Sequence, residues 1–258
     1  MNYQNLISDI SEWIKTYSHK NNFSTLVVGI SGGVDSAVVS TLCALTGINT
    51  IVVSLPIKQL KIQNDLSINH GIWLTEKYNN VKHEIINITK IFLDLEKTFE
   101  NLNYSSLHSF ANTRSRLRML ALYQIAGSSN GIVVGTGNKI EDFGVGFYTK
   151  YGDGGVDISP IGDCMKSDVW EMAKVLKINK NIINALPTDG LWDDGRTDED
   201  QLRGLSYEDL EKAMNLERHG NDSNEFNQKE LELLKVYKEI RTPNLHKMNE
   251  IPIFKLRK

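Results

Sequence analysis

The feature that most constrains the fold is a buried strand that runs directly into a serine- and glycine-rich turn. Residues 26–28 are Leu-Val-Val, and residues 29–36 read Gly-Ile-Ser-Gly-Gly-Val-Asp-Ser. We expect a helix from about Ser36, so this is a strand–turn–helix unit of the kind that builds parallel sheets. The turn would gather backbone N–H groups and a helix N-terminus around one small cavity, which suits a phosphate or pyrophosphate anion.

Asp35 adds a carboxylate beside this anion-binding turn. Mg2+ prefers oxygen ligands and is commonly shared between protein carboxylates and substrate phosphates, which makes Asp35 a candidate metal ligand. No Gly-Lys-Ser or Gly-Lys-Thr follows, so the turn is not a Walker loop. The alternative interpretation is a turn that merely caps a helix with Asp35 or Ser36.

Strand and helix patterns alternate over the first half of the chain. The predicted strands lie at 25–30, 50–55, 82–88 and 131–135, and the helices at 6–17, 37–45, 62–78, 91–102 and 110–126. This alternation predicts an α/β fold, a parallel sheet with helices on both faces. The segments Ser31–Ser36 and Thr136–Glu141 both follow strands, so they should meet at the carboxyl edge of the sheet.

The character of the chain changes after residue 150. We expect an amphipathic helix around Val169–Leu176, an acidic loop over Pro187–Asp200 and two further helices near Tyr207–Asn215 and Asn224–Arg241. Since no linker divides the chain, residues 1–258 are predicted to form one domain with a helical C-terminal extension.

Composition excludes several function classes. The net charge of −3 over 258 residues gives no sign of a nucleic-acid partner. The two cysteines, Cys43 and Cys164, lack C-x-x-C spacing, which argues against zinc or a disulfide framework and fits a reducing cytoplasm. Neither a secretory signal nor an apolar stretch of about 20 residues is present, so no membrane partner is expected.

A second informative stretch begins after the fourth predicted strand. Residues 135–142 read Gly-Thr-Gly-Asn-Lys-Ile-Glu-Asp, and residues 146–157 read Gly-Phe-Tyr-Thr-Lys-Tyr-Gly-Asp-Gly-Gly-Val-Asp. The Thr136 hydroxyl can hydrogen-bond a ligand, and Glu141, about one turn into the next helix, can reach the same metal as Asp35. The alternative is a solvated glutamate stabilised by the helix dipole.

These strings carry a family resemblance. Residues 31–36 match the S-G-G-x-D-S loop of the N-type ATP pyrophosphatases, which split ATP into AMP and pyrophosphate. The strings at 147–157 and 197–200 resemble those of ammonia-dependent NAD synthetase, and similar strings lie at 111–119, 134–141, 187–192 and 246–248. The resemblance runs from about Leu26 to the C-terminus. It implies an adenine nucleotide alpha hydrolase-like, Rossmann-like fold.

The resemblance also implies a reaction. ATP would adenylate the carboxylate of nicotinic acid adenine dinucleotide, and ammonia would then displace AMP to give NAD, so the enzyme would be a ligase forming a C–N bond. Two anionic nucleotides must be held together, so positioning and electrostatics should dominate catalysis. The family further implies Mg2+ and a homodimer, with residues 117–124 in the usual interface region.

Roles follow by position in the matching strings. The implied ATP-binding residues are Gly29, Ser31, Gly32, Gly33, Asp35, Ser36, Thr136, Lys166 and Thr188. The implied contacts to the dinucleotide are Asn112, Arg116, Lys150, Asp153, His246 and Lys247, the metal ligands are Asp35 and Glu141, and the catalytic residues are Asp35, Asp153 and Lys166. Asp153 is the expected acceptor of a proton from ammonium.

Plainer interpretations exist for several of these residues. Arg114, Arg116 and Arg118 could form a solvated helix face, Asp153 could only cap a turn, and Lys166 could snorkel at a helix start. His246 could simply be solvent-exposed. The segment from Ser54 onward matches the family poorly, so adenine contacts within 57–70 are left unassigned.

Two other functions compete with NAD synthesis. GMP synthetase and tRNA-thiolating enzymes share the loop, but the thiolases commonly show paired cysteines and a basic surface, and neither is evident here. A nucleotide-binding module without turnover would not need both Asp35 and Glu141. The chain has no room for an added glutaminase domain, so free ammonium is the expected nitrogen donor.

Overall fold

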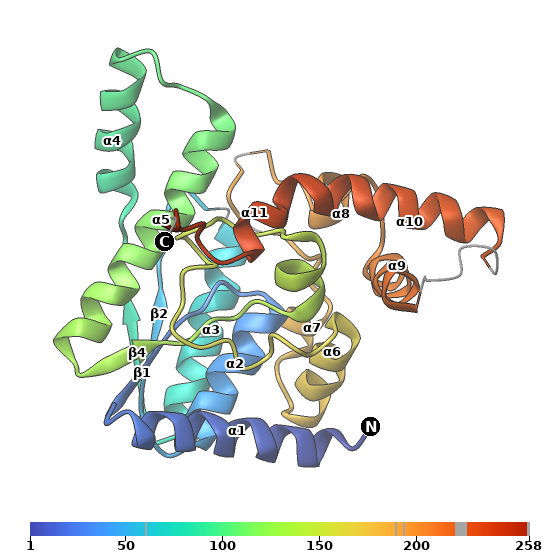
Figure 1. The fold of residues 1–258 in the computed structure, drawn as a ribbon. Coiled ribbons are helices and arrows are strands. Elements are labelled where there is room, and N and C mark those ends of the chain that lie inside the picture. Colours follow the sequence, from blue (N-terminus) through green and yellow to red (C-terminus); the bar gives the residue numbers. More distant parts are fainter. Residues whose placement is uncertain (60, 189, 193, 220–225, 257–258) are drawn as a thin grey trace.

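A four-stranded parallel sheet forms the centre of the molecule (Figure 1). The computed structural model describes residues 1–256 except 60, 189, 193 and 220–225. Its strands are β1 (Thr25–Gly29), β2 (Asn49–Ser54), β3 (Val81–Ile85) and β4 (Gly131–Val133), in the spatial order β3-β2-β1-β4. Val27 of β1 is in register with Ile51 of β2 and with Val133 of β4. The predicted parallel sheet is therefore confirmed.

Helices cover both faces of this sheet, as predicted (Figure 1). One face carries α1 (Tyr3–Lys20), α2 (Val34–Leu45), α3 (Lys61–Lys77), α6 (Lys166–Val175) and α7 (Lys180–Ile183); the other carries α4 (Thr89–Asn101) and α5 (Leu107–Ser128). Successive strand residues point to opposite faces, so Val28 packs towards α2 and Val27 towards α5. Because both faces are covered, β1 is apolar without alternation, whereas the edge strand β3 reads Val-Lys-His-Glu-Ile and is only partly buried.

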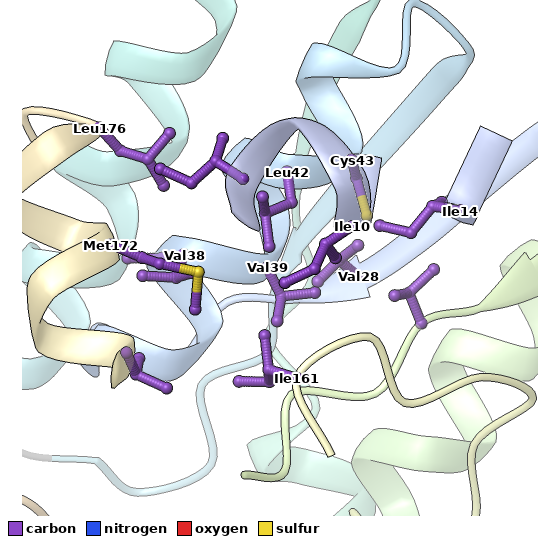
Figure 2. Close-up of a cluster of buried hydrophobic side chains, with 14 of the residues drawn as sticks. Ile10, Ile14, Val28, Val38, Val39, Leu42, Cys43, Ile161, Met172 and Leu176 are labelled. Carbon is purple, nitrogen blue, oxygen red and sulfur yellow. The ribbon is translucent and has the colours of Figure 1, made fainter. Parts of the chain in front are cut away.

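The largest apolar cluster surrounds helix α2. Figure 2 shows Val38, Val39 and Leu42 of α2 packed between Ile14 of α1 and Met172 of α6. All of these side chains are fully buried. Helix α2 is small and apolar on most sides because it lies between the sheet and two other helices. Cys43 belongs to the same cluster. Its thiol is buried there, so this residue contributes to core packing.

The C-terminal extension is helical and attached to the segment that follows β4. It contains α8 (Asp198–Gln201), α9 (Tyr207–His219), α10 (Gln228–Arg241), the 3-10 helix η3 (Thr242–Asn244) and α11 (Leu245–Met248). Helices α9 and α10 share an apolar cluster with the π-helix η1 (Lys139–Val145). The Arg241 guanidinium donates to the Phe143 carbonyl at 2.6 Å, and the Asn244 amide donates to the Val145 carbonyl at 3.0 Å.

Two local features differ from the prediction. The acidic stretch expected as a loop up to Asp200 ends in α8, because Thr197 and Asp200 form a capping box in which each side chain accepts a hydrogen bond from the other's backbone N–H. The strand expected at 82–88 ends at Ile85, whereas Glu141 lies in the helix expected after β4, here the π-helix η1. The start of the helix expected from 224 falls outside the described residues. In the described ranges, no helix is long and apolar enough to cross a membrane.

The packing around α2 predicts a position-specific loss of stability. Leu42→Ala should lower the free energy of unfolding by about 2–5 kcal/mol, because it removes a fully buried side chain from a close-packed cluster. Leu45→Ala, on the same helix but 43% exposed, should cost less than about 1 kcal/mol. Urea unfolding followed by circular dichroism measures both. Equal losses for the two variants would contradict this packing.

Candidate active site

The order of the strands determines where a ligand can bind. From β1 the chain first builds the sheet in one direction, through β2 and β3. It then returns and adds β4 on the other side of β1, so the strand order reverses between β1 and β4. Ligands of open parallel sheets bind at such a switch point, beyond the carboxyl ends of the strands. A cavity of about 280 Å³ opens there, between the segments that follow β1 and β4. Every residue expected to bind ATP lines it: Gly29, Ser31, Gly32, Gly33, Asp35, Ser36, Thr136, Lys166 and Thr188.

The turn after β1 has a conformation that requires glycine. Gly32 has a φ of +92°, and a Cβ there would lie 2.7 Å from the Gln63 carbonyl oxygen. The Ser36 hydroxyl accepts from the Ser31 N–H at 3.1 Å and contacts the Gly33 carbonyl at 3.0 Å, which closes the turn. Gly33 is the N-cap residue that precedes helix α2, and no side chain makes a capping hydrogen bond there.

This geometry bears on the capping interpretation of the turn. A capping role for Asp35 or Ser36 would satisfy the first N–H groups of α2, and neither side chain does so. The N-terminus of α2 therefore presents N–H groups and the positive end of its dipole to the cavity. Such an arrangement suits an anion.

Lys166 lies between the two carboxylates that were expected to share a metal. Its ammonium is 2.5 Å from Asp35 Oδ2 and 2.9 Å from Glu141 Oε1, and its side chain is only 3% exposed. Asn138 completes the arrangement: its amide donates to Asp35 at 3.0 Å, and its oxygen accepts from the Glu141 N–H at 3.0 Å. Lys166 is thus buried and paired rather than snorkelling.

Burial and charge act in opposite directions on these groups. Burial raises the pKa of Asp35, and the charge of Lys166 only partly offsets it. Burial also acts to raise the pKa of Glu141, but the Lys166 ammonium and the Tyr207 hydroxyl outweigh it, and the net shift is downward. Burial acts to lower the pKa of Lys166, and the two carboxylates reverse this and raise it. Lys166 therefore remains positively charged.

The donor atoms in this arrangement suit Mg2+. Two carboxylates converge on one cation, here the Lys166 ammonium, and hard oxygen ligands are what Mg2+ prefers. Within the part of the chain that the structure describes, no group of three or more His, Cys, Asp or Glu side chains could hold a metal ion alone. A metal bound by Asp35 and Glu141 would therefore need further oxygens from a nucleotide or water.

The residues expected to contact the second substrate lie apart from this cavity, with one exception. Asn112, Arg116, Lys150, His246 and Lys247 do not line it, whereas Asp153 does. They form a neighbouring group in which α5, the loop after η1 and α11 meet. Arg116 donates to the Lys150 carbonyl at 3.2 Å, and the Lys150 ammonium donates to the His246 carbonyl at 3.3 Å. The His246 ring itself is exposed, as its plainer interpretation expected.

Asp153 connects the cavity with this neighbouring group. One of its carboxylate oxygens accepts from the Ser115 hydroxyl of α5 and from the Thr149 N–H, the latter at 3.0 Å. Thr149 in turn donates to Asn112 at 2.6 Å, and Lys247 donates to the Tyr148 carbonyl at 2.7 Å. Asp153 therefore caps its turn and also lines the cavity, so the capping contacts leave its expected role towards the substrate open.

The three arginines of α5 do not form one solvated face. Arg114 is buried and donates to the Leu191 carbonyl at 2.8 Å, and Arg118 donates to the Leu55 carbonyl at 3.1 Å. Arg116 is exposed. The solvated interpretation is therefore wrong for Arg114 and Arg118, which tie loops at the cavity rim to α5.

Sequence reasoning missed several residues of the cavity. Asp142 directly follows Glu141 in sequence, yet the sequence analysis assigns it no role. Its carboxylate packs against Gly137, where a Cβ would not fit. Burial and the charge of Asp153 raise the pKa of Asp142 well above its usual value. Tyr207 reaches Glu141 from the C-terminal extension, and Asp198 accepts from the same Tyr207 hydroxyl. The unassigned segment 57–70 contributes Gln59, Gln63 and Leu66 to the lining.

Comparison with known proteins gives the family of the chain. A family model described as NAD synthase matches residues 6–252. The chain belongs to the NAD synthase family. Among the curated relatives, an NH(3)-dependent NAD(+) synthetase of Finegoldia magna is 38% identical over 213 residues, covering 82% of this chain and 84% of the relative. Another, of Methanococcoides burtonii, is 36% identical, covering 80% and 76%.

Solved structures of the family have the same fold. The structure of NMN synthetase from Francisella tularensis superposes with a TM-score of 0.85 at 28% identity, covering 99% of this chain and all of that one. The NH3-dependent NAD synthetase from Campylobacter jejuni, in complex with the nitrate ion, gives a TM-score of 0.79 at 25% identity, with the same coverage. The confirmed fold is thus that of the NAD synthase family, including the C-terminal extension.

The buried ion group predicts a pH-dependent loss of stability. Lys166→Met leaves Asp35 and Glu141 without their counter-ion, so their folded-state pKa values should rise above the unfolded values near 4. An acid whose pKa is raised by folding stabilises the fold at low pH and loses that contribution as pH rises. We expect a deficit of about 3–5 kcal/mol at pH 8 and a smaller one at pH 5.

Thermal unfolding at the two pH values measures this deficit. Lys174→Met is the matched control, since Lys174 lies on the same helix in a solvent-exposed pair with Glu171 and should have little effect at either pH. A deficit for Lys166→Met that did not grow between pH 5 and pH 8 would show that the carboxylates do not depend on this ammonium.

Proposed function

We propose that this chain amidates nicotinic acid adenine dinucleotide with ammonia in an ATP-dependent reaction, giving NAD, AMP and pyrophosphate through an adenylated intermediate. The observation that carries the proposal is the cavity at the switch point, where an anion-binding turn and an Asp–Lys–Glu group meet in a member of the NAD synthase family. The named activity of the curated relatives agrees with it.

The nucleotide half of the reaction assigns roles to the cavity residues. The N–H groups of the turn and of the first turn of α2 would bind the pyrophosphate part of ATP. Asp35 and Glu141 would hold Mg2+, which neutralises phosphate charge when bound. Lys166 would move from the carboxylates towards the phosphates, since its positive charge matches the anion that leaves.

The chemistry itself is two displacements. A carboxylate oxygen of the substrate forms a bond to the α-phosphorus of ATP, and the bond from that phosphorus to the β-phosphate bridging oxygen breaks, which releases pyrophosphate. Ammonia then attacks the activated carbonyl carbon, and AMP leaves. Asp153, held in place by Ser115 and Thr149, would take the proton that ammonium must lose before its nitrogen can attack.

The remaining expectations belong to the same proposal. Asn112, Arg116, Lys150, His246 and Lys247 would contact the dinucleotide where α5 approaches α11. Two copies of the chain would pair through the α5 side, where Leu120 is 67% exposed. The enzyme would act in the cytoplasm, in keeping with two unpaired, buried cysteines.

One structural neighbour favours a second candidate substrate. The NMN synthetase from Francisella tularensis is similar over the full length of both chains. Its name indicates a mononucleotide product, so the substrate of the present chain could be nicotinic acid mononucleotide. The same carboxylate would be amidated, and the two substrates differ only in the adenylate half, which lies away from the reacting group.

One assay separates these possibilities. The purified protein is incubated with ATP, Mg2+ and ammonium, together with either the dinucleotide or the mononucleotide, and the products are resolved by chromatography. We expect NAD and AMP in equal amounts from the dinucleotide, a much slower reaction with the mononucleotide, and no reaction with glutamine in place of ammonium. Preference for the mononucleotide would support the second candidate, and ADP or no amide would contradict both.

The proposed metal ligand gives a second test. Asp35→Asn keeps the shape of the side chain but removes its negative charge, so AMP formation should fall at least about 100-fold. The fold should persist, as judged by circular dichroism. Asp163→Asn is the control, because Asp163 is an exposed acid in a surface pair with Lys139. Near-normal turnover in Asp35→Asn would exclude the metal assignment.

A further inference from the structure

Tyr207 of helix α9 extends from the C-terminal extension into the nucleotide site. Its side chain is almost completely buried. Its hydroxyl donates to Glu141 Oε1 at 2.6 Å and lies 3.1 Å from Asp198 Oδ2. The hydroxyl therefore faces one proposed metal ligand and one carboxylate from helix α8.

The aromatic ring of Tyr207 contacts the third member of the buried ion group. The Lys166 ammonium lies 4.7 Å from the ring centroid, within the range of a cation–π interaction, and Trp170 of α6 packs edge-on at 5.8 Å. One side chain thus touches the cation and one carboxylate of the buried group. Its other neighbours, Asp198 and Trp170, belong to α8 and α6.

The hydroxyl carries a single hydrogen between two carboxylates. It can donate fully to only one of them at a time, and the shorter contact is to Glu141. Asp198 is the first residue of α8, and its N–H donates to the Pro187 carbonyl at 3.0 Å, so its position depends on how α8 is seated. A shift of α8 would change the second acceptor and hence the hydrogen bond to Glu141.

We propose that Tyr207 is a positioning residue that orients Glu141 and Lys166 for the Mg2+–nucleotide complex, and that its contact with Asp198 couples the seating of α8 to this orientation. The proposal rests on the nucleotide half of the proposed function. It assigns a role in ATP binding to the C-terminal extension, whose α9 and α10 lie beside the sheet rather than on it (Figure 1).

The test compares Tyr207→Phe with Tyr237→Phe. Tyr237 is buried in the same apolar cluster, and its hydroxyl lies near Gly144 rather than at the acid pair, so this control removes a buried hydroxyl without touching the site. Binding of α,β-methylene-ATP, which cannot be cleaved between its α- and β-phosphates, is measured by calorimetry at increasing Mg2+ concentrations. Steady-state kinetics and thermal unfolding complete the comparison.

Tyr207→Phe should raise the Mg2+ concentration needed for half-maximal nucleotide binding about tenfold and lower kcat about tenfold or more, because it removes a hydrogen bond to a charged group. The KM for the dinucleotide should stay within about twofold, and Tyr237→Phe should change none of these values. An unchanged Mg2+ dependence with only a lower Tm would show that Tyr207 is merely structural.

Asp198→Asn tests the coupling separately, and also serves if Tyr207→Phe fails to fold. It should shift the Mg2+ dependence of nucleotide binding in the same direction by about threefold, and a value equal to wild type would overturn the link to α8. The calorimetric measurement does not require amidation. If the wild type bound Mg2+ and the analogue but made no amide, the proposed substrate would be wrong and the role of Tyr207 would still be decided.

Discussion

The site depends on one buried ammonium. Lys166 bonds to Asp35, at the start of α2, and to Glu141, in the π-helix that follows β4, while it begins α6 itself. Three segments far apart in sequence thus converge on one charge. Burying such a group is a poor way to gain stability, because desolvation of the ions offsets most of their attraction. Its presence at the switch point of the sheet is better explained by the proposed complex of Mg2+ and a nucleotide, in which the cation would lie between the two carboxylates and the phosphates.

The surroundings of this group are arranged to hold its geometry. Asn138 contacts Asp35 with one end of its amide and the backbone before Glu141 with the other, so it fixes the spacing of the two carboxylates. Tyr207 adds a hydrogen bond to Glu141 from the C-terminal extension. The turn after β1 is fixed by its own hydrogen bonds and by Gly32. The proposed nucleotide would then meet a site whose geometry is already set, and such preorganisation is what electrostatic catalysis requires.

The parts predicted correctly from the sequence are those set by local pattern and by topology. The strand–turn–helix unit at 25–36 has a local signature, and the meeting of Asp35 with Glu141 follows from parallel strands ending at the same edge. The residues missed are those whose partners come from distant segments. Tyr207 lies 66 residues from Glu141 in sequence, and no local pattern distinguishes it from other buried aromatics. The burial of Arg114 and the hydrogen bond of Arg118 to the Leu55 carbonyl likewise depend on loops that only the folded chain brings to α5.

The two halves of the site differ in how they are built, and this bears on which substrate is amidated. The nucleotide half lies at the carboxyl edge of the sheet, on the first turns of α2 and η1, where the backbone is fixed by the core beneath it. The acceptor half joins α5, the loop at 146–155 and α11, through contacts that are mostly to backbone carbonyls, such as those of Lys150 and Lys247. Such contacts hold these segments of the protein together, but they do not themselves select one acceptor substrate over another. In the proposed reaction, ATP cleavage would therefore be retained while the acceptor changes. This asymmetry gives a physical reason why one fold includes both an NAD synthetase and an NMN synthetase among its solved structures.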